Sequence, residues 1–251
     1  MTQSRKAHAF KEMHSTQTPV VLYNIWDAGG AKAIVKAGSK AVATGSWSIA
    51  AAHGFADGEA MPLDFVLQIV ARIVATVDVP VTMDFEGGYG ASPEDVAQNA
   101  IRAMKTGAVG INFEDQVVQG HGLYDIAQQT ARLKAIRQAA VSIDVPLFIN
   151  ARTDLFLGSD PETHSSLVDQ AIEREAAYAT AGADGFFIPG LTDIALIEKI
   201  TAAASLPVNV MAMGDIKAPA DIAGTGVSRF SYGPAPYFSA ASDLKKRYSA
   251  I

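Results

Sequence analysis

The sequence contains no cysteine, and this absence removes several kinds of protein chemistry at once. Disulfide bonds, zinc ribbons, iron–sulfur clusters and thiolate catalysis all need cysteine, so none is expected here. Long apolar runs are lacking too, since no stretch reaches the roughly 20 residues that cross a membrane. The first ten residues, MTQSRKAHAF, carry basic side chains without an apolar stretch behind them, unlike a secretory signal. These features predict a cytoplasmic protein with no membrane partner.

Runs of basic charge are also missing. The chain has 20 Lys and Arg against 26 Asp and Glu, for a formal net charge of −6, and no basic patch is visible. Proteins that bind nucleic acid usually carry such a patch, so we expect no nucleic-acid partner. What remains is 251 residues with 49% hydrophobic and 18% charged side chains, as in a soluble enzyme with a large core. Without a linker or composition break, residues 1–251 are predicted to form a single domain.

The chain alternates short apolar runs with longer amphipathic segments. The apolar runs are rich in Val, Ile and Phe, as in buried parallel strands, and they cover 20–26, 41–45, 79–85, 109–114, 146–151, 185–189, 207–211 and 228–232. Helical spacing is found at 64–74, from the Ser92 cap to about Lys105, and at 129–141, 165–180, 193–204 and 239–248. Eight strands and their helices predict a (β/α)8 TIM barrel, with a doubly wound open sheet as the second possibility.

Polar residues gather where the predicted strands end. They are Asp27, residues 44–48, 84–90, 114–116 and 150–154, Asn209, and residues 231–233. In parallel α/β folds the carboxyl ends of the strands meet on one side, which is where the chemistry lies. Acids crowded on one rim repel one another and serve no structural purpose there. This pattern therefore predicts a functional site at that end of the barrel.

The acids on this rim are suited to a hard cation. Asp84, Glu86, Glu114 and Asp57 offer the oxygen ligands that Mg2+ or Mn2+ prefers, some of them acting through water. Residues two apart on an extended strand point the same way, so we expect Asp84 and Glu86 to share one ion. The alternative is that these acids cap helices or pair with lysines.

Three further features concern the substrate. Arg152 has the planar fork that binds carboxylate or phosphate, unless it serves only as an ion pair to Glu114 or Asp154. His121, between two glycines, is either an acid–base group or a surface histidine. The N–H groups at residues 45–47 (Gly45, Ser46 and Trp47) can face a carboxylate, and Asn209 lies on the rim as well. Residues 87–90 are better explained as a turn before the Ser92 helix.

Three motifs together resemble the isocitrate lyase/phosphoenolpyruvate mutase superfamily. They are residues 84–90 (DFEGGYG), 110–116 (GINFEDQ) and 149–154 (INARTD), and the resemblance runs from about Asn24 to Tyr237. It implies a barrel whose last helix is exchanged in a homotetramer or homodimer. It also implies Mg2+ near Asp84 with Asp57, Glu86 and Glu114 around it. A substrate carboxylate would be held at residues 45–47, with Arg152 contacting the substrate.

The sequence departs from the family pattern at three places. Gln119 stands where the isocitrate and methylisocitrate lyases carry their acidic cysteine, and an amide cannot donate that proton at neutral pH. The predicted sixth strand ends in Ile188-Pro189-Gly190, without the histidine found in phosphonate enzymes. Glu86 replaces the usual aspartate. Methylisocitrate cleavage in particular is therefore not expected.

Three functions follow from these features. The first is a Mg2+-dependent lyase or decarboxylase that breaks a C–C bond next to a small 2-oxo acid or dicarboxylate through an enolate, with Arg152, Glu114 and His121 as catalytic groups. The second is a phosphonomutase or phosphonopyruvate hydrolase, which needs more cations than the sequence offers. The third is a non-catalytic metabolite-binding barrel that has lost its loop acid.

Overall fold

The computed structural model describes residues 1–15 and 17–251, and within them eight parallel strands form one sheet. The strands are β1 (Val20–Leu22), β2 (Val42–Ala43), β3 (Val81–Asp84), β4 (Gly110–Glu114), β5 (Phe148–Arg152), β6 (Gly185–Phe187), β7 (Val208–Met211) and β8 (Arg229–Ser231). Their order is β1-β8-β7-β6-β5-β4-β3-β2, and a parallel bridge between Ile25 and Thr44 brings its two ends together. The predicted (β/α)8 barrel is confirmed, and the doubly wound open sheet is wrong.

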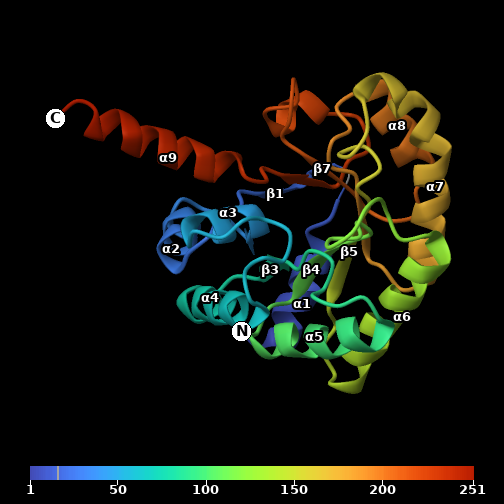
Figure 1. Ribbon diagram of the computed structural model, residues 1–251, viewed down its shortest axis with the longest axis horizontal. Helices are drawn as coiled ribbons and strands as arrows, with labels where there is room; N and C mark the ends of the chain where they lie inside the picture. Colours follow the sequence, from blue (N-terminus) through green and yellow to red (C-terminus); the bar gives the residue numbers. More distant parts are fainter. Residues whose placement is uncertain (16) are drawn as a thin grey trace.

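Helices surround this barrel (Figure 1). They are α1 (Gln3–Glu12), α2 (Ala28–Lys36), α3 (Ser46–Ala52), α4 (Leu63–Thr76), α5 (Pro93–Lys105), α6 (Ile126–Ser142), α7 (His164–Thr180), α8 (Ile194–Ala203) and α9 (Ala235–Tyr248), with short 3-10 turns at Pro161–Thr163 and Pro219–Ile222. The predicted cap of α5 is confirmed, since the Ser92 hydroxyl accepts a hydrogen bond from Asp95 N at 3.1 Å. The described helices are not long and apolar enough to cross a membrane.

The short helices α1, α2 and α3 were not expected from hydrophobic spacing. Asp27, which the sequence placed among the polar residues of the rim, is the N-cap of α2: its carboxylate accepts a hydrogen bond from Gly30 N at 2.6 Å. Ser46 and Trp47, whose N–H groups were expected to face a carboxylate, are the first residues of α3. These helices are seven to ten residues long, too short for periodicity to show them.

Helix α1 closes the N-terminal end of the barrel. Its Phe10 is fully buried and meets the ring of Phe148 edge-on, with 5.4 Å between ring centroids. A Cβ atom at Gly110 would come within 3.1 Å of the Phe10 ring and 2.8 Å of the Thr82 hydroxyl, so glycine is needed there. With this end filled, ligands have access only from the opposite end of the described barrel, where the strands finish.

The interior of the barrel is unusually polar. On β4, Ile111 and Phe113 point outward into the main apolar core, so Asn112 and Glu114 point inward. Other strands, and the segment that follows β1, add polar groups that are almost completely buried: Asn24, Thr82, Asn150, Asn209, Arg229 and Ser231. Barrel interiors are commonly filled by branched apolar side chains. This layer therefore places hydrogen-bonding groups directly beneath the site.

Helix α9 behaves differently from the rest of the chain, because it projects away from the barrel (Figure 1). Its apolar residues Leu244 and Tyr248 are 70% and 78% exposed. On β1 and just after it, Val21 and Tyr23 are also exposed, at 40% and 42%. A single chain thus leaves apolar groups uncovered both on α9 and beside β1.

Candidate active site

A cavity of about 400 Å3 opens where the strands end. Its polar lining comes from Asn24, Ser46, Asp57, Asp84, Asn112, Arg152 and Ser231, and its apolar lining includes Trp47, Leu157, Phe187, Pro189, Met211, Met213 and Phe238. Five of the predicted site residues thus meet in one space: Ser46, Trp47, Asp57, Asp84 and Arg152. Gly45 is a sixth predicted site residue in this lining. The cavity therefore lies where the strand-end rule predicts a functional site.

Asp84 is the last residue of β3, and its two carboxylate oxygens have different surroundings. Oδ2 accepts hydrogen bonds from Ser46 N at 3.1 Å and Ser46 Oγ at 2.9 Å. Oδ1 is buried and has no hydrogen-bond partner among the described residues. A buried carboxylate oxygen without a partner is costly unless a cation binds it. Asp84 therefore fits the expected Mg2+, with Oδ1 as the ligand atom.

The N–H groups at residues 45–47 are already used in part. Ser46 N holds Asp84, and Gly45 N donates to the carbonyl of Ile25 at 3.3 Å. Trp47 contributes its side chain to the cavity, where its ring lies 4.4 Å from that of Phe238. The binding of a substrate carboxylate by this segment stays a prediction, and Ser46 also hydrogen-bonds the carboxylate of Asp84.

The other acids surround Asp84 without joining it in a single cluster. Asp57 lines the cavity, and its partial burial, followed by repulsion from Asp84, raises its pKa. Glu86 does not share the direction of Asp84, because β3 ends at Asp84 and Glu86 has a left-handed φ of 51°. Its carboxylate accepts hydrogen bonds from Glu59 N at 2.7 Å and the Tyr89 hydroxyl at 2.8 Å. The expected extended spacing is therefore wrong.

The described residues contain no group of three or more carboxylates or histidines that could hold an ion by themselves. Mg2+ commonly takes one or two protein carboxylates and keeps several waters. A site with Asp84 as the direct ligand and Asp57 close to it would agree with this coordination preference. The places of Glu86 and Glu114 in a wider water shell stay predictions.

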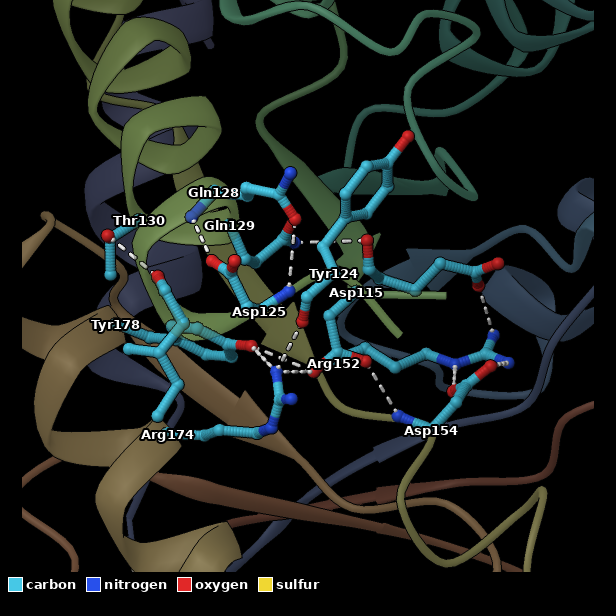
Figure 2. A network of polar contacts seen from close by, with 12 residues as sticks. Asp115, Tyr124, Asp125, Gln128, Gln129, Thr130, Arg152, Asp154, Arg174 and Tyr178 are labelled. Atoms are coloured by element: carbon cyan, nitrogen blue, oxygen red, sulfur yellow. Dashed lines mark hydrogen bonds and ion pairs between the residues drawn. The ribbon is translucent and has the colours of Figure 1, made fainter. Parts of the chain in front are cut away.

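Arg152 ends β5 between two carboxylates (Figure 2). Its Nε and Nη2 donate to Asp154 at 2.5 and 2.8 Å, and its Nη1 lies 2.9 Å from Glu114 Oε2. Desolvation alone would lower the pKa of Arg152, but Glu114 and Asp154 outweigh it and raise that pKa. Three of the five N–H groups are occupied, which leaves two for a ligand. Arg152 is thus a structural ion pair, and its role as an anion-binding group stays a prediction.

Asp115 fixes the position of Asp154, which in turn binds Arg152 (Figure 2). It is fully buried, and its Oδ1 accepts a hydrogen bond from Asp154 N at 3.0 Å. Its Oδ2 accepts from Arg174 Nη1 at 3.0 Å and from the Tyr178 hydroxyl at 2.8 Å. Helix α7 therefore positions Asp154, and through Asp154 the guanidinium of Arg152. Periodicity identified α7 but not the two buried polar side chains on its inner face.

The loop after β4 stays outside the cavity. Gln116 and Leu123 form an antiparallel bridge, and Val118 packs so closely that a Cβ on Gly87 would lie 2.7 Å from it. His121 is exposed at the tip of this hairpin and does not line the cavity. Gln119 lines a separate cavity of about 380 Å3, which is bordered by Tyr124 and Arg132. The structure therefore does not bring His121 to the other site residues.

Two asparagines have roles that the sequence did not reveal. Asn24 lines the cavity, and its Oδ1 accepts hydrogen bonds from the N–H groups of Tyr232 and Gly233. Asn112 also lines the cavity, although only the acid two residues further on drew attention. In contrast, the predicted Asn209 is fully buried against Ser231 and does not line the cavity. Asn24 and Asn112 could have been predicted, because they lie two residues from Leu22 and Glu114 and residues two apart on a strand point the same way.

The chain is similar in sequence and in structure to known proteins. Residues 10–251 match the family model described as phosphoenolpyruvate phosphomutase. An uncharacterised protein of Mycobacterium tuberculosis is 31% identical over 91% of this chain and 83% of its own. The 2-methylisocitrate lyase of Escherichia coli K12 is 28% identical over 80% of this chain and 67% of its own. A crystal structure from Burkholderia cenocepacia J2315, provisionally assigned as a phosphonomutase, has a TM-score of 0.96, 44% identity and 99% coverage of both chains.

The chain therefore belongs to the isocitrate lyase/phosphoenolpyruvate mutase superfamily, and the resemblance seen in its three motifs is confirmed. The superfamily consists of Mg2+-dependent lyases and mutases that act on C–C or P–C bonds. The named homologues are lyases and mutases. The fold and cavity described above are those of such an enzyme.

Glu86 leads to a prediction about pH. Burial raises the pKa of Glu86 to about 7; the Tyr89 hydrogen bond opposes this rise, and repulsion from Asp84 adds to it. A folded-state pKa above the unfolded value means that stability is lost as pH rises from about 4.5 to 7. We expect Glu86→Gln to avoid this loss, so its stability relative to the wild type should rise by up to roughly 3 kcal/mol between pH 5 and 8.

Urea unfolding at several pH values, in EDTA, measures this difference. Glu94→Gln, which removes an exposed carboxylate from α5, is the matched control. Parallel stability profiles for Glu86→Gln and the wild type would show that Glu86 is ionised in the folded protein throughout this range.

Proposed function

We propose that this chain is a Mg2+-dependent lyase or decarboxylase that breaks a C–C bond next to a 2-oxo carboxylate through an enolate, with Mn2+ as a possible substitute. The observation that carries the proposal is the pairing, in one cavity, of Asp84 with its unpartnered Oδ1 and Arg152 with two remaining N–H groups. A metal ligand and an anion-binding group at one site suit a chelating 2-oxo acid. Family membership supports the same chemical class.

Each residue contributes a separate part of this chemistry. Mg2+ bound at Asp84 would supply Lewis-acid stabilisation of the negative charge that develops on the oxo group. Ser46 orients the Asp84 carboxylate, and Arg152 binds the substrate anion and stabilises developing charge. Glu114 keeps the Arg152 guanidinium in place. Water in the cavity is the proton donor that we propose, because the exposed His121 does not line it.

The charges around the cavity limit the substrate. Asp57 and Asp84 line it, and the single cationic side chain in that lining, Arg152, is already paired with Glu114 and Asp154. With one cationic side chain in the lining, the cavity offers few charge-assisted contacts to the additional carboxylates of a tricarboxylate. We therefore propose a small oxo acid or dicarboxylate as the substrate, rather than a tricarboxylate.

The apolar lining specifies the rest of the substrate. Leu157, Phe187, Pro189 and Met211 border the cavity beside the polar groups. A hydrophobic wall binds an alkyl group well and desolvates a charged group at a cost. We therefore propose that this wall accommodates an uncharged part of the substrate, such as a methyl or another short alkyl substituent on its carbon chain.

The second candidate is a P–C bond enzyme, which the 44% identical structure provisionally assigned as a phosphonomutase favours. A phosphonate brings additional negative charge, and Pro189 stands near the end of β6 where such enzymes use a histidine. The third candidate, a binding barrel without turnover, keeps Asp84 and Arg152 but no reaction. Substrate tests separate the three.

Turnover with Mg2+ should identify the reaction. We expect release of CO2 and a 2-oxo acid from oxaloacetate (giving pyruvate) or from an alkyl-substituted oxaloacetate, above the rate with metal alone. Methylisocitrate, phosphonopyruvate and phosphoenolpyruvate should remain unchanged. Phosphate release from phosphonopyruvate would instead establish the P–C candidate, and tight oxalate binding with no turnover of any compound would establish the binding barrel.

Removal of Asp84 should abolish the metal-dependent part of ligand binding. We expect Asp84→Ala to lose the effect of Mg2+ on oxalate affinity, because the ion loses its direct ligand. Isothermal titration with oxalate, with and without Mg2+, measures this effect. Asp193→Ala, which removes the distant cap of α8, is the control. An unchanged Mg2+ effect in Asp84→Ala would remove Asp84 from the metal site.

The projecting helix α9 supports the exchange of this helix between subunits of a homodimer or homotetramer. Its Leu244 is 70% exposed in a single chain, which is unfavourable unless a partner covers it. We expect light scattering to give a dimer or tetramer mass, and Leu244→Glu to shift it toward the monomer. A monomer mass for the wild-type chain would contradict this part of the proposal.

A further inference from the structure

The amide of Asn112 has only one possible orientation in the floor of the cavity. Its Oδ1 accepts hydrogen bonds from Asn150 Nδ2 and Arg229 Nη2, both at 2.9 Å. A guanidinium has no acceptor, so the amide group facing Arg229 must be the oxygen. The Asn112 amide nitrogen is therefore directed away from Arg229. Because Asn112 lines the cavity, this nitrogen is available to donate to a bound ligand.

Arg229 is a buried cation without a counter-ion. It is 1% exposed at the start of β8, and its Nε and Nη1 have no hydrogen-bond partner among the described residues. The ion pairs found in the described chain do not include it, whereas the buried Arg174 pairs with Asp115. An isolated buried charge is expensive to keep. Its contribution to the fold does not explain that cost.

The charge of Arg229 acts on the cavity. Burial lowers the pKa of Arg229 to about 9, with the carboxylate of Asp84 acting in the opposite direction, so the guanidinium remains protonated at neutral pH. Asp84 is the metal ligand proposed above, which means that the cation lies within electrostatic reach of the site. The acidic side chains around the cavity outnumber the cationic ones. The positive charge of Arg229, beneath the cavity floor, partly offsets this negative charge.

We propose that Asn112 and Arg229 form a second oxyanion subsite in the floor of the cavity. Asn112 Nδ2 donates a hydrogen bond to a carboxylate or oxo oxygen of the bound 2-oxo acid. Arg229 is a positioning residue that fixes the Asn112 amide and adds positive potential beneath that oxygen. The subsite deepens the proposed function and rests on it for the identity of the ligand, while its own contacts are those of the polar barrel interior.

If the subsite exists, substitution of Arg229 should lower ligand affinity without lowering the stability of the fold. Replacing a buried unpaired charge by an apolar side chain of similar volume is commonly neutral or stabilising. A purely structural arginine would instead lose stability on substitution. We expect Arg229→Met to unfold at the same or a higher urea concentration than the wild type. In the presence of Mg2+, its oxalate affinity should fall about tenfold or more, as for loss of a charge-assisted contact.

Asn112→Asp provides a second variant of nearly the same shape. The aspartate still offers oxygens to Asn150 and Arg229, but it presents an acceptor to the ligand in place of an N–H donor. We expect its fold to be retained and its oxalate affinity to fall at least tenfold. Combining it with Arg229→Met should cost less than the sum of the two single effects, because both act on one contact.

The control is Arg137→Met, which removes a partly buried arginine that bonds to Leu147 O, Gly182 O and Asp184 away from the cavity. It should lose stability and keep its oxalate affinity. Oxalate affinities within twofold of the wild type in both Arg229→Met and Asn112→Asp would overturn the subsite, as would a wild-type chain that does not bind oxalate. Oxalate binding without any turnover would overturn the proposed lyase activity and leave the subsite standing.

Discussion

The site depends on the buried carboxylate of Asp115. This group joins the end of β4 to the segment after β5 through Asp154 N, and to α7 through Arg174 and Tyr178 (Figure 2). Arg174 compensates the charge of Asp115, which would otherwise be too costly at full burial. Asp154 can then hold the Arg152 guanidinium with two hydrogen bonds. The guanidinium that we propose as the anion-binding group is thus placed by residues that do not line the cavity.

The two sides of the cavity solve different electrostatic problems. On the metal side, Ser46 satisfies one oxygen of Asp84 and leaves the other for a cation. On the floor, Arg229 and Asn150 occupy the oxygen of Asn112 and leave its N–H groups for an anion. In each case a neighbouring residue hydrogen-bonds one atom of a polar side chain. The other polar atom of that side chain is then left for the proposed ligand. The chelating oxo acid and Mg2+ that we propose would be complementary to both sides.

Much of the architecture follows from local patterns. Eight apolar runs identify the strands, and Ser92 with its proline and acids identifies the start of α5. The rule that chemistry lies at strand ends predicted that Asp84 and Arg152 are close together, and both line the same cavity. Local patterns failed where the backbone leaves regular geometry. Glu86 departs from the strand direction because its φ is positive, and His121 lies on a hairpin held away from the cavity by the packing of Val118 against Gly87.

The sequence by itself determined the barrel, the superfamily and the acid-rich rim, because periodicity and short motifs are local properties of the chain. The tertiary structure decided which polar groups face one another. Asn112 and Arg229 are 117 residues apart, and Ser46 and Asp84 are 38 apart. Their contacts exist only because parallel strands that are distant in the chain share one barrel interior. The direction of each donor and acceptor in that interior depends on its neighbours across the barrel, and these neighbours decide what the cavity can bind.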